Sequence, residues 1–268
     1  MHMRVHIVTP ANRHLYTAQL DQMHRQRRAM FVEKRKWTEL DNGSPYEIDE
    51  FDHNGAFYLL AVGDVGEVHG SARLVPTWKP HLFGGVLSDY VDNKEAARGP
   101  GVWEYSRWLP GSGLDPSLDG ACRAALLCAT AEFALSHQVE AFVACIETRF
   151  LNIFAEVGWP VAFLGEPQRF NRGKAVAIRF AIGPDELQST RDCFGYSSPS
   201  SLELPAWGPD ARLDPASFAV LDAILAIEDD RCRRDILEYC VCGPTDDEQE
   251  SVGGDLDPFL FATTQGNA

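Results

Sequence analysis

The chain has 268 residues, of which 45% are hydrophobic and 24% are charged, and its formal net charge is −15. This balance is typical of a folded globular protein and excludes a fibre or a wholly disordered chain. The negative charge argues against broad nucleic-acid binding, which needs a basic surface. Membrane helices need roughly 18 consecutive apolar residues, which the sequence lacks, and its start has no signal-peptide core. We therefore predict a cytoplasmic protein without a membrane span.

The first hundred residues predict β-strands around one helix. Residues 3–8 alternate as a strand does, and residues 14–35 carry the spaced apolar positions of a helix. Residues 57–63 and 67–77 are two β-rich runs around a Gly-Asp-Val-Gly connection, which predicts a hairpin. Residues 76–101 are rich in Pro and Gly and predict a long loop.

The following residues alternate helix and strand more regularly. Residues 118–137 predict the clearest helix, with Asp119 as its N-cap. The remaining predicted elements are strands at 102–110, 140–147 and 174–182 and a helix at 148–158. This order predicts an α/β fold in which meander strands come first and helix–strand alternation follows.

The composition changes after the last predicted strand. We predict one folded domain over residues 1–195, a Ser- and Pro-rich linker over 196–215, and an extension over 216–268 that begins as a helix and ends in an acidic tail. Residues 201–268 contain 15 acidic and 4 basic side chains, so most of the excess negative charge lies there.

Standard catalytic motifs are missing from the sequence. It contains no Walker phosphate loop, HExxH motif, paired CxxC, nucleophile elbow or GxGxxG after a strand. Cys232, Cys240 and Cys242 lack the partner ligands of a zinc site, and we predict no metal. Several hydrolase, nucleotide-binding and metalloenzyme classes are therefore excluded.

Acidic residues and arginines nevertheless occur in segments that otherwise look apolar. Asp49 and Asp52 flank Phe51, Arg73 lies inside a predicted strand, and Glu104 lies in the next. Buried charges need partners. Two interpretations stay open at this point, namely a structural ion network and a polar active site.

The strand at 102–110 poses a question of geometry. Alternation places Glu104 and Ser106 on one face and Trp103, Tyr105 and Arg107 on the other, unless a bulge re-aims one of them. Glu104 and Arg107 therefore share a face only if the strand is irregular.

These residues form an ordered set of anchors. They are Arg27-x3-Phe31-x5-Trp37, Asp49-x2-Asp52, Arg73 in SARLVPT and Glu104-x2-Arg107 in WEYSR, with the segments PHLFGGVLSDY and EVGWPVAFLGEP between and after them. In order and spacing the set resembles the acyl-homoserine-lactone synthases, or autoinducer synthases. The resemblance covers roughly residues 3–185, and residues 200–268 have no counterpart in it.

The resemblance implies a fold related to the GNAT acyltransferases. In such a fold a mixed central sheet with splayed strands is flanked by helices, so residues 1–195 are the catalytic domain and the C-terminal helical and acidic extension is an addition. It also implies synthesis of a quorum-sensing acyl-homoserine lactone from S-adenosylmethionine and an acyl thioester, with release of methylthioadenosine. S-adenosylmethionine is then a substrate, and no permanently bound cofactor is expected.

The resemblance assigns roles to the anchors. Glu104 is the expected base for the substrate amine, and strand amides near Ser106 are expected to stabilise the developing oxyanion. The other expected catalytic residues hold the charges of the zwitterionic substrate: Asp49, Asp52, Arg73 and Arg107. Arg27, Phe31 and Trp37 are expected to bind S-adenosylmethionine, the aromatic rings by covering the adenosyl group and attracting the sulfonium.

An apolar slot for the acyl chain is expected near residues 141–159. Ala144 lacks the hydroxyl that such enzymes associate with 3-oxo chains, so no 3-oxo preference is predicted. Core packing is an equal alternative for each of the candidates, which are Phe142, Ala144, Ile146, Phe150 and Phe154.

The acyl donor is acyl-carrier protein or acyl-CoA. The basic run at 24–36, with Arg149, Arg169, Arg172 and Lys174, suits an acidic carrier protein. CoA-dependent GNAT enzymes bind the pyrophosphate with an Arg/Gln-x-x-Gly-x-Gly/Ala loop, and the nearest segment here, residues 107–113, is one residue longer than that pattern. We therefore favour carrier protein. Two alternatives to the lactone synthase remain, namely a CoA-dependent GNAT N-acyltransferase acting on another amine and a non-catalytic regulatory member.

Overall fold

A computed structural model of the chain describes residues 3–112, 115–171, 173–197, 199–204, 206, 213, 215–225 and 231. The strands are β1 (Arg4–Val8), β2 (Phe57–Val62), β3 (Val68–Pro76), β4 (Val102–Leu109), β5 (Ala141–Glu147), β6 (Val161–Phe163), β7 (Gln168–Phe170), β8 (Gly173–Phe180) and β9 (Ser201–Leu202). The α-helices are α1 (Thr17–Arg27), α2 (Asp119–Ser136), α3 (Leu151–Val157), α4 (Pro184–Phe194) and α5 (Pro215–Leu225). Among the described residues, no helix combines the length and apolar character needed to cross a membrane.

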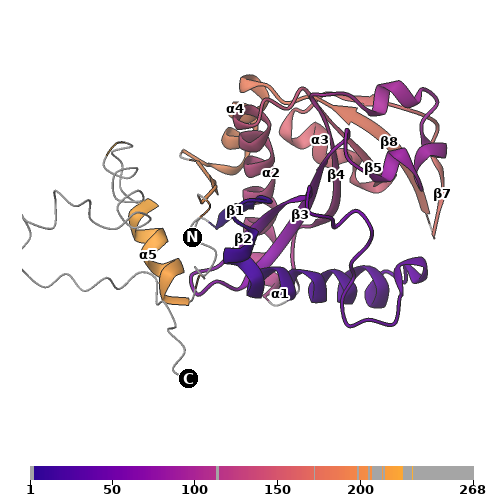
Figure 1. Ribbon diagram of the computed structural model, residues 1–268. Helices are drawn as coiled ribbons and strands as arrows, with labels where there is room; N and C mark the ends of the chain where they lie inside the picture. Colours follow the sequence, from indigo (N-terminus) through magenta and orange to yellow (C-terminus); the bar gives the residue numbers. More distant parts are fainter. Residues whose placement is uncertain are drawn as a thin grey trace, which may run out of the picture.

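The strands form one mixed sheet (Figure 1) in the order β6-β8-β5-β4-β3-β2-β1-β9, with β7 also paired to β8. Neighbours are antiparallel except for β4 with β5 and β1 with β9. The β4–β5 pairing runs only from Val102 opposite Ala141 to Glu104 opposite Val143, although both strands continue beyond it. The sheet therefore opens after Glu104, which confirms the predicted α/β fold with splayed central strands.

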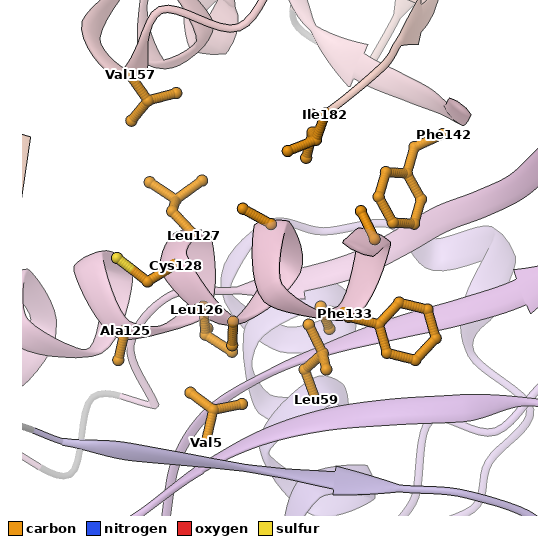
Figure 2. Packing of buried hydrophobic residues seen from close by; sticks show 14 of the residues in the cluster. Val5, Leu59, Ala125, Leu126, Leu127, Cys128, Phe133, Phe142, Val157 and Ile182 are labelled. Carbon is orange, nitrogen blue, oxygen red and sulfur yellow. The ribbon is translucent and has the colours of Figure 1, made fainter. Parts of the chain in front are cut away.

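Alternating strand residues build a separate core on each face of the sheet. Leu59 and Ala61 of β2 pack into the main core with α2, whereas Tyr58 and Leu60 pack into a second core with residues of α1. Figure 2 shows α2 between Val5 and Leu59 of the sheet and Val157 of α3. The period-2 pattern of the strands thus places α1 and α2 on opposite faces.

The helix predicted at 14–35 changes its winding twice. A 3-10 turn occupies Arg13–Tyr16, α1 follows, and Arg28–Lys34 is a π-helix in which Arg35 N donates to Met30 O over 2.9 Å. Wider π turns often occur at functional sites. The apolar spacing predicted a helix correctly, but the same spacing fits 3-10, α and π turns and could not distinguish them.

Two other local predictions differ from the structure. Asp119 is the first residue of α2 rather than its N-cap, which is Leu118, because a 3-10 turn at Pro116–Leu118 leads directly into the helix. The residues of α4 were not predicted as a helix, yet Glu186 accepts a hydrogen bond from Gly183 N over 2.8 Å at its start, which is half of a capping box. By contrast, Gly158 ends α3 in the left-handed conformation, as expected.

The predicted linker contains ordered backbone. Ser201 and Leu202 pair with β1, and Glu132 of α2 accepts hydrogen bonds from the backbone amides of Ser200 and Ser201. Beyond the predicted linker, the ring of Phe218 in α5 packs closely on Gly66 (φ +85°). A Cβ atom at position 66 would lie 2.6 Å from the Phe218 ring. The predicted acidic tail, Cys232, Cys240 and Cys242 lie outside the described residues.

His6 makes the stability of this domain depend on pH. Its side chain is 4% exposed, and burial, with a smaller effect of Arg4, lowers its pKa to about 3. Below pH 6.5, His6 therefore binds a proton in the unfolded chain but stays neutral in the folded protein. The folded state is at its full stability above pH 6.5 and loses free energy of unfolding as the pH falls towards 3. Between pH 7.5 and 5 we expect His6 to cost about 2 kcal/mol of unfolding free energy.

Urea unfolding at both pH values checks this expectation. His6→Gln removes the titrating group, and it should lose less unfolding free energy on acidification than the parent chain. An equal loss in both proteins would mean that other groups carry the pH dependence.

Candidate active site

Seven charged side chains gather where β4 and β5 part, on the face of the sheet that carries α1. They are the arginines Arg27, Arg73 and Arg107 and the carboxylates Glu47, Asp49, Asp52 and Glu104. Ser106 joins them, because its Oγ accepts a hydrogen bond from Arg73 Nε over 3.1 Å. The structure thus brings together all six predicted catalytic residues.

Arg27 is the fixed end of this cluster. Its Nη1 and Nη2 donate to the two carboxylate oxygens of Asp52 at 2.7 and 2.9 Å, and its Nε donates to Glu47 Oε2 at 2.6 Å. Tyr58 also donates to Asp52 Oδ1, over 3.0 Å. The side chain of Arg27 has no exposed surface, and its hydrogen bonds among the described residues go to these two acids.

Arg73 occupies the centre of the cluster from the middle of β3. Its Nη1 lies 2.5 Å from Asp49 Oδ1 and 3.2 Å from Asp52 Oδ2. Its Nη2 lies 3.9 Å from Glu104 Oε1, which is beyond hydrogen-bond distance. Arg73 therefore links the fixed acids to Glu104 without saturating Glu104.

Glu104 is fully buried and only half satisfied. Leu82 N donates to its Oε2 over 2.5 Å. Within the described chain, its Oε1 and the Nη2 of Arg73 make no hydrogen bond. Burial raises the pKa of Glu104, and the nearby charge of Arg73 offsets only part of this rise. A carboxylate with a raised pKa and a free oxygen is suited to accept a proton.

A bulge brings Arg107 onto the same face. Ser106 lies opposite Arg73 and Leu109 lies opposite Ser71, so Arg107 and Trp108 together oppose one residue of β3. Arg107 has the left-handed φ of 53°. Its Nη2 then reaches Glu47 Oε1 at 2.9 Å and Asp49 Oδ2 at 2.7 Å. Strict alternation would have placed it on the opposite face.

The cluster carries one negative charge in excess when its four carboxylates are ionised. Burial raises the pKa of Glu47, but Arg27 and Arg107 outweigh it and hold the pKa below its usual value. The same competition, with Arg27 and Arg73 as partners, lowers the pKa of Asp52. Three guanidiniums face four carboxylates here, so the site is suited to a ligand with a positive charge.

An aromatic pair adjoins the cluster. Phe31 is 1% exposed and stacks on the half-buried Trp37, with ring centroids 5.0 Å apart and an interplanar angle of 13°. The guanidinium of Arg107 lies 6.0 Å from the ring of Phe31. Phe31 therefore lies between the charged cluster and Trp37, and Trp37 presents the more accessible ring.

The predicted acyl-slot residues fall into two groups. Phe142 and Ala144 have almost no exposed surface and belong to the main core. Ile146, Phe150 and Phe154 are partly buried and pack against that core. The second group lies at and beyond the end of β5 that has parted from β4, where an apolar chain can enter with least rearrangement.

Glu47 is the cluster member that sequence reasoning missed. It is 1% exposed and contacts both Arg27 and Arg107. The available signal was its spacing two residues before Asp49 in EIDEFD. That segment has no regular periodicity, so burial of Glu47 was not predictable from it.

Comparisons with known proteins point in one direction. The model of the autoinducer synthase family matches residues 12–189. The chain is 31% identical over 224 residues to the isovaleryl-homoserine lactone synthase of Bradyrhizobium diazoefficiens, covering 84% of this chain and 98% of that protein. It is 28% identical over 209 residues to an acyl-homoserine-lactone synthase of Agrobacterium fabrum, covering 76% and 98% of the two chains.

Solved structures agree with the sequence relatives. One is the structure of BjaI, a CoA-dependent acyl-homoserine lactone synthase, with SAM and isopentyl-CoA. It is 31% identical to this chain and superimposes with a TM-score of 0.68, and the match covers 82% of this chain and 99% of BjaI. Another is MesI, also a CoA-dependent acyl-homoserine lactone synthase, at 28% identity and a TM-score of 0.63, over 74% and 98%.

Proposed function

The chain belongs to the autoinducer synthase family, and on that basis we propose how its own residues make an acyl-homoserine lactone from S-adenosylmethionine and an acyl thioester. One observation carries the proposal. Glu104 Oε1 and Arg73 Nη2 are buried, lack hydrogen bonds within the described chain and lie 3.9 Å apart where the strands part. A substrate with both an ammonium and a carboxylate group can satisfy both atoms.

The charge of the cluster matches this substrate. S-adenosylmethionine carries an ammonium, a sulfonium and a carboxylate, so its net charge is positive, whereas the cluster has one carboxylate in excess. Asp49 is the cluster acid with the most exposed side chain, at 18%, and for this reason we assign it to the ammonium. The accessible ring of Trp37, backed by Phe31, supplies an aromatic surface for the adenosyl group and the sulfonium.

Glu104 starts the acyl transfer. Its carboxylate takes a proton from the substrate ammonium, directly or through one water, and the free amine attacks the thioester carbonyl. Backbone amides around Ser106 and Trp108, turned by the bulge, stabilise the negative oxygen of the tetrahedral intermediate. The intermediate collapses as the carbon–sulfur bond breaks, and the departing thiolate takes up a proton to become the thiol.

Ring closure follows within the acylated product. The substrate carboxylate oxygen attacks the γ-carbon, the bond from that carbon to the sulfonium breaks, and methylthioadenosine leaves as a neutral thioether. Loss of the sulfonium charge drives this step, and Arg73 orients the carboxylate through its Nη2, which has no hydrogen-bond partner in the described chain. Arg27 and Asp52 take no part in bond making and hold the other groups in place.

We further propose that acyl-CoA is the donor, which revises the preference drawn from sequence. Two arginines of the basic run are neutralised by their neighbours, because Arg25 pairs with Asp21 and Arg28 pairs with Asp41, each at 2.9 Å. The run therefore offers an acidic carrier protein less positive surface than its composition suggests. BjaI and MesI, both CoA-dependent, support the same donor class.

Competition between donors tests this assignment. With one acyl group presented on CoA or on carrier protein, kcat/KM should be about 10-fold higher for the CoA thioester and should change little with salt. The triple variant Arg25→Glu, Arg28→Glu, Lys34→Glu should keep its acyl-CoA activity. A carrier-protein rate that exceeds the CoA rate, and that salt or the triple variant suppresses, would restore carrier protein as the donor.

A further inference from the structure

The side chain of Trp108 contains a buried hydrogen-bond donor. Its indole Nε1 is inaccessible and makes no hydrogen bond within the part of the chain that the structure describes. Arg73 Nη2 and Glu104 Oε1 share this property, and Glu104 lies on the same strand, β4. The proposed function uses those two atoms and leaves Trp108 Nε1 unexplained.

The fold satisfies a comparable indole elsewhere. Trp159 is 5% exposed in the main core, and its Nε1 donates to Thr190 Oγ1 over 2.8 Å. A buried donor without an acceptor weakens the folded state. At Trp159, where the indole packs in the core, the nitrogen has a partner. This contrast suggests that the partner of Trp108 is brought by a ligand.

The position of Trp108 identifies that ligand. It follows the bulge at Arg107, beyond the last β4–β5 pair at Glu104. Its ring meets Phe150 edge-on, with centroids 6.4 Å apart, and Phe150 is one of the partly buried residues at the end of the expected acyl slot. The backbone around Trp108 also belongs to the proposed oxyanion site. With the thioester carbonyl at that proposed site, the side chain of Trp108 would lie beside the first carbons of the acyl chain.

We propose that Trp108 Nε1 donates a hydrogen bond to an oxygen on the acyl chain, so that this protein selects 3-oxo or 3-hydroxy acyl thioesters over plain hydrocarbon chains of equal length. The inference rests on the proposed function. Ala144 on the neighbouring strand β5 has no side-chain hydrogen-bond donor, whereas Trp108 on β4 has one. An oxygenated chain satisfies the indole, whereas a hydrocarbon chain leaves it unpaired.

Three thioesters of one chain length test the inference: butanoyl-CoA, 3-oxobutanoyl-CoA and 3-hydroxybutanoyl-CoA. The parent protein should show a kcat/KM about 10- to 100-fold higher for an oxygenated chain than for butanoyl-CoA. Trp108→Phe keeps an aromatic ring and removes the donor, so this ratio should fall to near one. Trp159→Phe removes the structural indole and should leave the ratio unchanged.

The remaining outcomes separate the two proposals. If the parent protein forms lactones from all three thioesters at similar kcat/KM, the role of Trp108 is refuted while the proposed function stands. If Trp108→Phe slows all three equally, the indole serves the thioester carbonyl, and its part in selection is refuted. If no thioester on CoA or carrier protein yields a lactone, the proposed function itself fails.

Discussion

Replacing Glu104 with glutamine is expected to lower the rate of lactone formation about 100- to 10,000-fold. Glutamine keeps an oxygen that can accept from Leu82 N but cannot take a proton from the substrate amine. The protein should stay folded, because burial raises the pKa of Glu104 and ionising it opposes folding at neutral pH. Initial rates at saturating substrate and thermal unfolding of the same preparation check both parts.

Glu95→Gln is the matched control for this variant. Glu95 is exposed and pairs with Arg98 on a surface turn away from the cluster, so its replacement should leave turnover unchanged. Near-normal turnover in Glu104→Gln would assign the base to another group. Loss of thermal stability together with activity would instead show a structural defect.

The second large effect is expected on stability, from Arg27→Ala. This change leaves Glu47 and Asp52 buried with one guanidinium fewer, and removing one partner of a buried charge network typically costs about 3 to 5 kcal/mol. Urea unfolding at pH 7.5 measures the loss. Arg25→Ala, on the same helix with an exposed partner in Asp21, should change stability little.

A small effect of Arg27→Ala on unfolding would mean that the network tolerates loss of its buried end. A stability loss in Arg25→Ala as large as that in Arg27→Ala would trace the effect to the helix rather than to the ion pairs. Either result would remove the positioning role assigned to Arg27.

Much of the fold was predictable because its signals are local. The hairpin of β2 and β3, the strand at β5 and the end of α3 at Gly158 follow from alternation and turn residues. The winding of the π-helix was not predictable from the sequence, because π and α turns share nearly the same apolar spacing. The pairing of β9 with β1 joins residues about two hundred positions apart, and no local pattern encodes such a contact.

The site was predictable to the extent that buried charge needs compensation. Arg73 and Glu104 stood out because strand positions are usually apolar, and both are completely buried. The place of Arg107 depended on a bulge that its sequence does not reveal, and Glu47 lay in a segment without periodicity. Family resemblance supplied the roles, whereas distances and burial separate the groups that can meet a substrate from those that position them.

The cluster therefore contains two kinds of charged group, those that are fully paired and those that keep, within the described chain, an unpaired atom. Arg27 and Asp52 satisfy each other, whereas Glu104 Oε1 and Arg73 Nη2, which are just as buried, have no hydrogen-bond partner among the described residues. In the proposed mechanism, the paired side chains fix the geometry with which the two unpaired atoms hold the zwitterion. The proposed mechanism therefore uses two buried atoms that have no hydrogen-bond partner within the described residues.

Product stoichiometry tests the central claim most directly. Purified protein incubated with S-adenosylmethionine and an acyl-CoA, and followed by mass spectrometry, should form an acyl-homoserine lactone and methylthioadenosine in equal amounts, and Glu104→Gln should lose both products together. Acylation of an amine without release of methylthioadenosine, or no reaction with any acyl thioester on CoA or carrier protein, would contradict it.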